Sequence, residues 1–187
     1  MGEERKQVQG KVGMGHGASL AIVVMGVSGS GKSSLGAALA DRLGCAFLEG
    51  DAFHSPCNVA KMRDGIALTD ADRWPWLDRL GAALGAAVAR DGVAVAACSA
   101  LRRSYRQRLA AAARRPIAFI LLNASAGELQ RRLGARPGHY MPASLLESQL
   151  QTLEWPAVEE GALVLESSAP VDGLCDQALT WLGAKAL

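Results

Sequence analysis

Apolar runs alternate with amphipathic segments along most of the chain. The continuous runs predict buried β-strands at residues 20–25, 46–51, 93–98, 117–122 and 162–165. Apolar residues at helical spacing predict helices at residues 34–43, 58–63, 75–90, 102–114, 125–133, 144–153 and 171–182. Strands that alternate with helices are typical of a mostly parallel sheet that helices cover on both faces. The pattern therefore predicts an α/β fold in the form of a three-layer sandwich.

The N-terminal segment breaks this pattern. Residues 1–17 are polar and rich in glycine, and they contain no apolar core of a signal peptide. We interpret them as a disordered tail. Residues 18–187 show no internal repeat and no second hydrophobic core, and their number suits a single domain.

Composition narrows the classes of partner. Half of the 187 residues are hydrophobic, which is enough for a sizeable core, and the net charge is only +2. The charges are interspersed and no apolar run approaches a membrane span, so neither nucleic acid nor a membrane is indicated as a partner. The four cysteines show neither a C-x-x-C pair nor zinc-ligand spacing. We therefore expect reduced thiols in a cytoplasmic protein.

The clearest motif follows the first predicted strand. Residues 26–33 match G-x-x-x-x-G-K-[ST], the phosphate-binding loop (P-loop), and they lie between a predicted strand and a predicted helix. The glycines let successive backbone N–H groups turn towards a phosphate, and the helix N-terminus adds partial positive charge. We expect nucleotide phosphates to contact Gly26, Val27, Ser28, Gly29, Ser30, Gly31, Lys32, Ser33 and Ser34.

Three side chains, two at the end of the P-loop and one at a strand end, have predicted roles in catalysis or metal binding. Lys32 is the cation for the outer phosphates, and Ser33 offers a hydroxyl group to Mg²⁺. An acid near the metal is also expected, and ligands in open α/β sheets gather where strands end. Strand 46–51 ends in Asp51, whereas strand 93–98 ends without an acid. Asp51 is suited to bind the metal directly or through water, to accept a proton from a substrate hydroxyl, or to cap a helical turn.

A nucleotide-binding regulatory switch of the GTPase kind is the main alternative to a kinase. It requires an acid-x-x-glycine string after a strand and a guanine-reading N-K-x-D string. Acid-x-x-glycine occurs at 41–44 and 78–81, within predicted helices, and N-K-x-D does not occur. The sequence therefore disfavours this alternative.

Further strings extend the pattern beyond the P-loop. In order they are Glu49-Gly50-Asp51-x-x-His54, Asn58-x-x-Lys61-Met62-x-x-Gly65, Leu68-Thr69-Asp70-x-Asp72-Arg73-x-Pro75-Trp76-Leu77, Cys98-Ser99-Ala100-Leu101-x-x-x-Tyr105-Arg106, Gly138-His139-Tyr140-Met141-Pro142 and Leu145-Leu146-x-Ser148-Gln149-x-x-Thr152-Leu153-Glu154. In this order and spacing, the chain from about Ile22 to Glu154 resembles gluconokinases of the P-loop type. It departs from the usual family pattern at Ala67, where proline is common, and at Tyr140, where phenylalanine is common.

The resemblance implies phosphorylation of D-gluconate to 6-phosphogluconate by ATP with Mg²⁺, which feeds gluconate into the pentose phosphate pathway. It also implies a P-loop kinase fold like that of shikimate kinase, with a five-stranded parallel sheet, a helical lid and assembly as a homodimer. On the residues alone, shikimate or adenylylsulfate would suit as the acceptor equally well. A nucleotide kinase also stays open, although no base pocket is evident.

Gluconate is an anion with several hydroxyl groups, so its site needs cationic and hydrogen-bonding side chains. The matched strings supply candidates that follow strand ends, namely Asp51, His54, Lys61, Arg73, Ser99 and Arg106. Motif context favours Arg73 and Arg106, whereas Lys61 and His54 are equally compatible with a solvated surface.

Residues 131–142 form the predicted lid. Arg132 and Arg136 lie one helical turn apart, and a proline-glycine pair then ends the helix. We expect the lid to place both arginines on the phosphates as catalytic cations, so that they act together with the two other predicted catalytic residues, Lys32 and Asp51. We also expect it to bring His139 to the substrate side. The alternative is that the arginines pair with surface acids such as Glu128.

Overall fold

The structure of the protein, a computed structural model, describes residues 19–134 and 143–185. The predicted tail at 1–17 and most of the predicted lid lie outside these residues. The elements in chain order are β1 (Leu20–Met25), α1 (Lys32–Leu43), β2 (Ala46–Glu49), η1 (Gly50–Phe53), α2 (Pro56–Arg63), α3 (Asp70–Asp91), β3 (Val93–Ala97), α4 (Arg103–Ala113), β4 (Ile117–Asn123), α5 (Ala126–Gly134), α6 (Ala143–Thr152), η2 (Val158–Glu160), β5 (Leu163–Glu166) and α7 (Val171–Lys185). None of the helices in the described ranges is both long and apolar enough to cross a bilayer.

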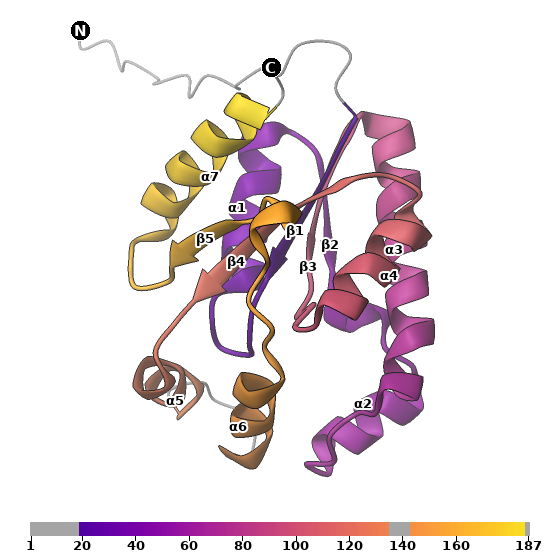
Figure 1. The fold of residues 1–187 in the computed structure, drawn as a ribbon, viewed down its shortest axis with the longest axis vertical. Coiled ribbons are helices and arrows are strands. Elements are labelled where there is room, and N and C mark those ends of the chain that lie inside the picture. Colours follow the sequence, from indigo (N-terminus) through magenta and orange to yellow (C-terminus); the bar gives the residue numbers. More distant parts are fainter. Residues whose placement is uncertain (1–18, 135–142, 186–187) are drawn as a thin grey trace, which may run out of the picture.

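The strands form one five-stranded parallel sheet in the order β2-β3-β1-β4-β5 (Figure 1). β1 is central, and its Val23 lies opposite Ala96 of β3 and Phe119 of β4. The P-loop follows β1, so it leaves the sheet at the middle of its carboxyl edge. The predicted three-layer α/β sandwich is confirmed.

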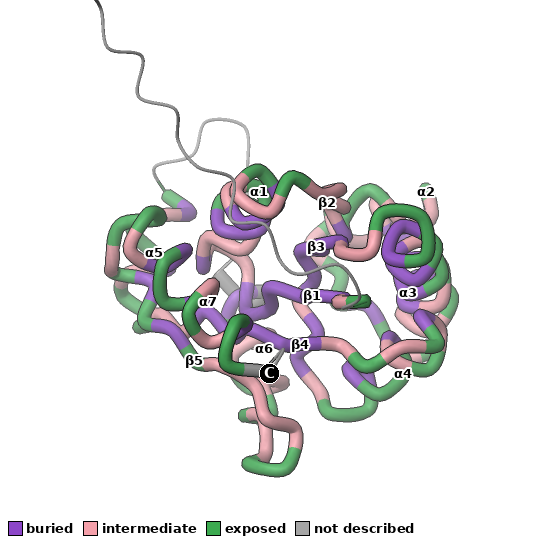
Figure 2. The backbone as a smooth tube through the Cα atoms, turned by 90° about the horizontal axis from the view of Figure 1, so that it is seen from above, coloured by how far each residue is buried: buried purple, intermediate pink, exposed green. Residues whose placement is uncertain are grey.

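Side chains of β1 alternate between two hydrophobic clusters, one on each face of the sheet. Val23 packs with residues of α3 and α4, whereas Val24 packs with residues of α1 and α7. Figure 2 shows the buried central strands with α1 and α7 on one side and α3 and α4 on the other. Helices thus cover both faces, which explains why β1 reads as a continuous apolar run rather than an alternating one.

A third cluster lies at the carboxyl edge and holds the P-loop in place. Val27 of the loop packs with Leu129 and Leu133 of α5 and with Leu146 of α6. In Figure 1, α2, α5 and α6 all lie at the end of the molecule towards which the strand arrows point. The helices at this edge therefore form the walls around the P-loop.

Two segments at this edge differ from the sequence-based prediction. Residues 70–73, which precede the predicted helix at 75–90, form the first turn of α3 because Thr69 and Asp72 make a capping box. The Thr69 N–H donates to the Asp72 carboxylate at 2.9 Å, and the Asp72 N–H donates to Thr69 Oγ1 at 3.3 Å. The second strand ends at Glu49 rather than at Asp51, which lies in the short 3₁₀ helix η1.

Candidate active site

Three glycines with positive φ shape the P-loop. The φ angles are 139° at Gly26, 82° at Gly29 and 100° at Gly31, in a region that L-residues rarely adopt. At Gly29, a Cβ atom would also come within 3.1 Å of the Leu133 side chain. Gly31 caps α1 without a side-chain hydrogen bond, and the first turn of α1 carries no acid. The positive end of this helix is therefore not neutralised locally, as an anion site requires.

Lys32, Ser33 and Ser34 form the first turn of α1. Lys32 Nζ donates to the Val27 carbonyl oxygen at 3.0 Å, so the ammonium group lies against the loop. Ser33 and Ser34 are exposed. The predicted phosphate cation and metal-binding hydroxyl thus stand beside the glycine backbone.

A cavity of about 440 Å³, here called the larger cavity, lies on one side of the P-loop. It is lined by the loop, α1, α5 and the connection from β5 to α7, with Gly29, Ser30, Gly31, Ser34, Leu35, Arg131, Arg132, Ser167, Pro170, Val171 and Leu174 among its residues. Its floor is the backbone that the motif predicts for phosphate binding.

Arg132 lies between the P-loop and the larger cavity. Its Nη1 donates to the Ser30 carbonyl oxygen at 3.3 Å and its Nη2 to the Ser167 carbonyl oxygen at 2.6 Å. Its Nη2 also lies 2.7 Å from Glu128 Oε1. The position beside the phosphate loop and the pairing with Glu128, which the sequence presents as alternatives, therefore occur together. Arg136 and His139 lie outside the described residues.

A second cavity, of about 110 Å³ and here called the smaller cavity, lies on the other side of the loop. Its lining includes Ser28, Lys32, Asp51, His54, Met62, Leu68, Arg73, Trp76, Ser99, Ser148 and Gln149. The structure thus brings together six of the predicted site residues, namely Ser28, Lys32, Asp51, His54, Arg73 and Ser99.

Asp51 lies in η1 with its side chain exposed at the smaller cavity. The helix that follows is capped by another residue, because Ser55 Oγ accepts a hydrogen bond from the Asn58 N–H at 3.2 Å. The capping alternative for Asp51 is therefore wrong. Its carboxylate is therefore not used as a helix cap, and the residue lines the smaller cavity.

His54 is held by an aromatic stack. Its ring lies 4.1 Å from the ring of Trp76 at an interplanar angle of 19°, and Trp76 Nε1 donates to the Gly50 carbonyl oxygen at 2.7 Å. Burial lowers the pKa of His54; Asp51 opposes this shift, and Arg73 reinforces it. His54 Nδ1 is buried and makes no hydrogen bond within the described residues. A neutral imidazole with an unused nitrogen thus borders the smaller cavity.

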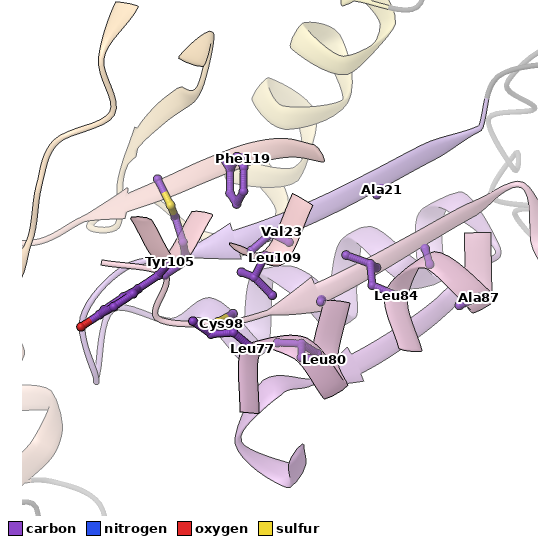
Figure 3. Close-up of a cluster of buried hydrophobic side chains, with 14 of the residues drawn as sticks. Ala21, Val23, Leu77, Leu80, Leu84, Ala87, Cys98, Tyr105, Leu109 and Phe119 are labelled. Carbon is purple, nitrogen blue, oxygen red and sulfur yellow. The ribbon is translucent and has the colours of Figure 1, made fainter. Parts of the chain in front are cut away.

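Arg73 is fixed by a polar network at the start of α3. Its Nη1 donates to the Leu68 carbonyl oxygen and, at 3.3 Å, to the Tyr105 hydroxyl oxygen. The Tyr105 hydroxyl in turn donates to Asp70 Oδ1. Figure 3 shows the Tyr105 ring at the edge of the hydrophobic cluster, with its hydroxyl oxygen pointing away from the other labelled side chains. Arg73 Nη1 also lies 3.8 Å from Asp70 Oδ1, so Leu68, Tyr105 and Asp70 together hold the guanidinium in place.

Two predicted substrate residues do not line the smaller cavity. Lys61 Nζ lies 2.7 Å from Asp72 Oδ1, and this hydrogen bond is the main cause that lowers the pKa of Asp72 to about 2. Arg106 is 1% exposed, and its Nε and Nη2 donate to the Glu160 carboxylate at 2.6 and 2.9 Å. Its Nη1 donates to three backbone carbonyl oxygens. The structure thus gives Arg106 a structural role in place of the predicted contact with substrate.

Among the residues lining the cavities, three with uncharged polar side chains were given no role from the sequence. Ser148 and Gln149 stand in one of the matched strings, but they lie on a helix that follows no strand, so the strand-end argument does not reach them. Ser167 directly follows β5, and the same argument applied to the last strand would have found it.

The cysteines play no part in this chemistry. All four are unpaired, as the sequence predicts. Cys98, at the end of β3, is 1% exposed, and burial raises its pKa to about 12. A thiol in this state is a small apolar core residue rather than a nucleophile.

Comparisons of sequence agree with this geometry. The family described as an AAA domain matches residues 22–156. The gluconokinase of Gluconobacter oxydans (strain 621H) is 48% identical over 158 residues, which cover 84% of this chain and 88% of that relative.

Solved structures give the same result. A gluconokinase from Sinorhizobium meliloti 1021 is 46% identical and superposes with a TM-score of 0.81 over 90% of this chain and 94% of that chain. A shikimate kinase from Acinetobacter baumannii in complex with shikimate superposes with a TM-score of 0.59 over 90% of this chain and 95% of that chain. Its identity of 18% shows a common fold alone.

Proposed function

This chain belongs to the gluconokinase family and has the fold of the P-loop kinases, and we propose that it transfers the γ-phosphoryl group of ATP to a hydroxyl group of D-gluconate. The products are 6-phosphogluconate and ADP. The observation that carries the proposal is a P-loop shared by two cavities. Gly29, Ser30 and Gly31 line the larger cavity, whereas Ser28 and Lys32 line the smaller one. ATP bound in the larger cavity and gluconate bound in the smaller cavity would therefore both contact the P-loop.

The larger cavity suits ATP. Its volume of about 440 Å³ lies in the usual range for small-molecule sites. Leu35, Val171 and Leu174 provide apolar wall for a base, and the P-loop backbone provides N–H groups for the phosphates. Arg132 stands beside the same backbone and adds a cation.

Mg²⁺ fits the oxygen donors that border the P-loop. This ion prefers oxygen ligands, keeps several waters and usually takes only one or two protein ligands together with substrate phosphates. Ser33 and Asp51 are exposed and offer a hydroxyl and a carboxylate oxygen. No group of three or more His, Cys, Asp or Glu side chains in the described ranges forms a metal cage, which fits an ion held largely by phosphates. When bound, the ion supplies positive charge to the phosphates.

The smaller cavity suits gluconate. Arg73 presents a cation to a carboxylate, and Ser99 and His54 line the same cavity with side chains that can hydrogen-bond to hydroxyl groups. Asp51 shares this cavity with Lys32, so its carboxylate is placed to accept the proton of the attacking hydroxyl or to hold the metal, directly or through water. The ammonium group of Lys32 then stabilises the negative charge that develops on the transferred phosphoryl group.

The test is an assay that couples ADP release to NADH oxidation, with gluconate, shikimate, glucose, glycerate and nucleoside monophosphates as acceptors. We expect gluconate to give by far the highest kcat/KM. Activity confined to another acceptor would show that the acceptor is wrong while the kinase assignment stands. ATP turnover with none of them would favour a binding or regulatory role.

We expect Asp51→Asn to lower kcat by roughly 10²-fold or more with little change in thermal stability, because the amide can neither accept a proton nor balance a metal charge. Steady-state kinetics at several Mg²⁺ concentrations measure this effect. Partial recovery at high Mg²⁺ would indicate metal binding, whereas a loss that Mg²⁺ does not change would indicate a general base. Kinetics like those of the unmodified protein at every Mg²⁺ concentration would remove Asp51 from the mechanism.

Assembly as a homodimer in the cytoplasm stays a prediction. Support comes from two apolar side chains exposed after α6, Trp155 at 57% and Val158 at 96%. Sedimentation equilibrium decides between this assembly and a monomer of 19.5 kDa.

A further inference from the structure

Gln149 of α6 makes a hydrogen bond to the P-loop itself. Its Oε1 accepts from the Ser28 backbone N–H at 2.7 Å, across 121 residues of sequence. Because an amide N–H needs an oxygen acceptor, this bond also sets which end of the carboxamide faces the loop. A side chain from outside the motif thus accepts a hydrogen bond from one of the backbone N–H groups of the P-loop.

This bond competes with a phosphate. The Ser28 N–H is a single donor, and the P-loop binds phosphate oxygens through donors of this kind. Ser28 and its partner Gln149 both line the smaller cavity, in which the proposed function places the acceptor. A phosphoryl oxygen that takes this N–H therefore displaces Gln149 Oε1.

The displaced carboxamide has a second place to bind. Gln149 itself lines the smaller cavity, next to Ser148 and together with His54 and Arg73. The helix that carries it is also held against the loop by packing, because Leu146 and Leu150 belong to the cluster around Val27. Only the side chain needs to turn, and its amide can then exchange hydrogen bonds with the hydroxyl groups of an acceptor.

We propose that Gln149 couples the two substrate sites: a phosphoryl group on the Ser28 N–H releases the Gln149 carboxamide to bind the acceptor. This inference rests on the proposed function, since it needs ATP and a hydroxyl-rich acceptor. Each substrate then increases the affinity of the protein for the other. The factor is the same whether ATP or the acceptor binds first. If Gln149 only held α6 on the loop, its loss would change stability and leave this factor intact.

The experiment measures the dissociation constant of the β,γ-imido analogue of ATP by calorimetry, with and without saturating gluconate. In the unmodified protein we expect gluconate to tighten analogue binding roughly fivefold or more. In Gln149→Leu we expect less than a twofold effect. Gln151→Leu is the matched control: Gln151 lies on the same helix but is exposed, with its Nε2 on Glu147 Oε1 at 3.4 Å, and it should retain the full coupling.

Coupling of unchanged size in Gln149→Leu, or no coupling in the unmodified protein, would overturn the proposal. Gln149→Glu provides a second test that does not depend on the folding of the leucine variant. Its carboxylate keeps an acceptor for the Ser28 N–H but repels a phosphate, so the analogue should bind roughly tenfold more weakly, and unchanged binding would contradict the proposed position. The acceptor assay distinguishes failure of this proposal from failure of the proposed function. If the protein phosphorylates an acceptor other than gluconate, the coupling is measured with that acceptor instead.

Discussion

Replacement of Lys32 by methionine is expected to lower kcat by roughly 10³-fold or more. The transition state of phosphoryl transfer spreads negative charge over the oxygens of the moving group, and a cation placed there stabilises it more than it stabilises bound ATP. Lys32 Nζ lies against the loop at 3.0 Å from the Val27 carbonyl oxygen, and its side chain borders the smaller cavity. Methionine keeps an unbranched side chain and a good helix former at the start of α1.

The measurement is steady-state kinetics with ATP and gluconate, together with the melting temperature. Arg90→Ala is the control for loss of one positive charge, because Arg90 is an exposed residue in the last turn of α3 that pairs with its neighbour Asp91. It should retain normal kinetics. A Lys32→Met protein with a raised KM and an unchanged kcat would show that Lys32 only binds ATP.

Arg132→Ala is expected to lower kcat by roughly 10³-fold, since an arginine supplied to a transferring phosphoryl group is worth about 10³–10⁵ in rate. The structure places its guanidinium on the Ser30 carbonyl oxygen, at the edge of the phosphate loop. Its ion pair with Glu128 is part of the same geometry, and the Glu128 side chain is 24% exposed. We infer that Glu128 orients the arginine rather than neutralising it.

Glu128→Gln tests this reading of Arg132, because it removes the ion pair and leaves the arginine. A partly exposed pair contributes about 1 kcal/mol or less, so both variants should melt within a few degrees of the unmodified protein. We expect Glu128→Gln to keep most of kcat while Arg132→Ala loses it. A kcat of Arg132→Ala close to that of the unmodified protein would show that Arg132 serves only its ion pair and that another cation, such as Arg73, acts on the phosphates.

The sequence alone determined the architecture, because the period of apolar residues reflects local geometry. A run such as residues 20–25, apolar at every position, indicates a strand buried on both faces, and the structure shows Val23 and Val24 packed on opposite sides of the sheet. The P-loop was equally readable, since its glycines meet a local backbone requirement, with φ at Gly29 and Gly31 of 82° and 100°.

The strand-end argument also located residues that line the smaller cavity. Asp51, His54, Arg73 and Ser99 lie in the connections after β2 and β3 or near them, and all four border the smaller cavity. Parallel strands release their chains at one edge, so side chains far apart in sequence meet there. The local sequence pattern and the topology of the sheet together were sufficient to predict that these residues lie close together.

Only the tertiary structure decided which of the predicted charged side chains line the smaller cavity. Arg73 and Arg106 stand in equally convincing strings, yet Arg106 is buried against Glu160, 54 residues away. Lys61 is likewise committed to Asp72. A buried charge needs a partner of opposite sign, and that partner is set by which distant segments pack together, which no local period records. The same reason hides the bond from Gln149 to Ser28, because its two ends meet only after α6 has packed on the P-loop.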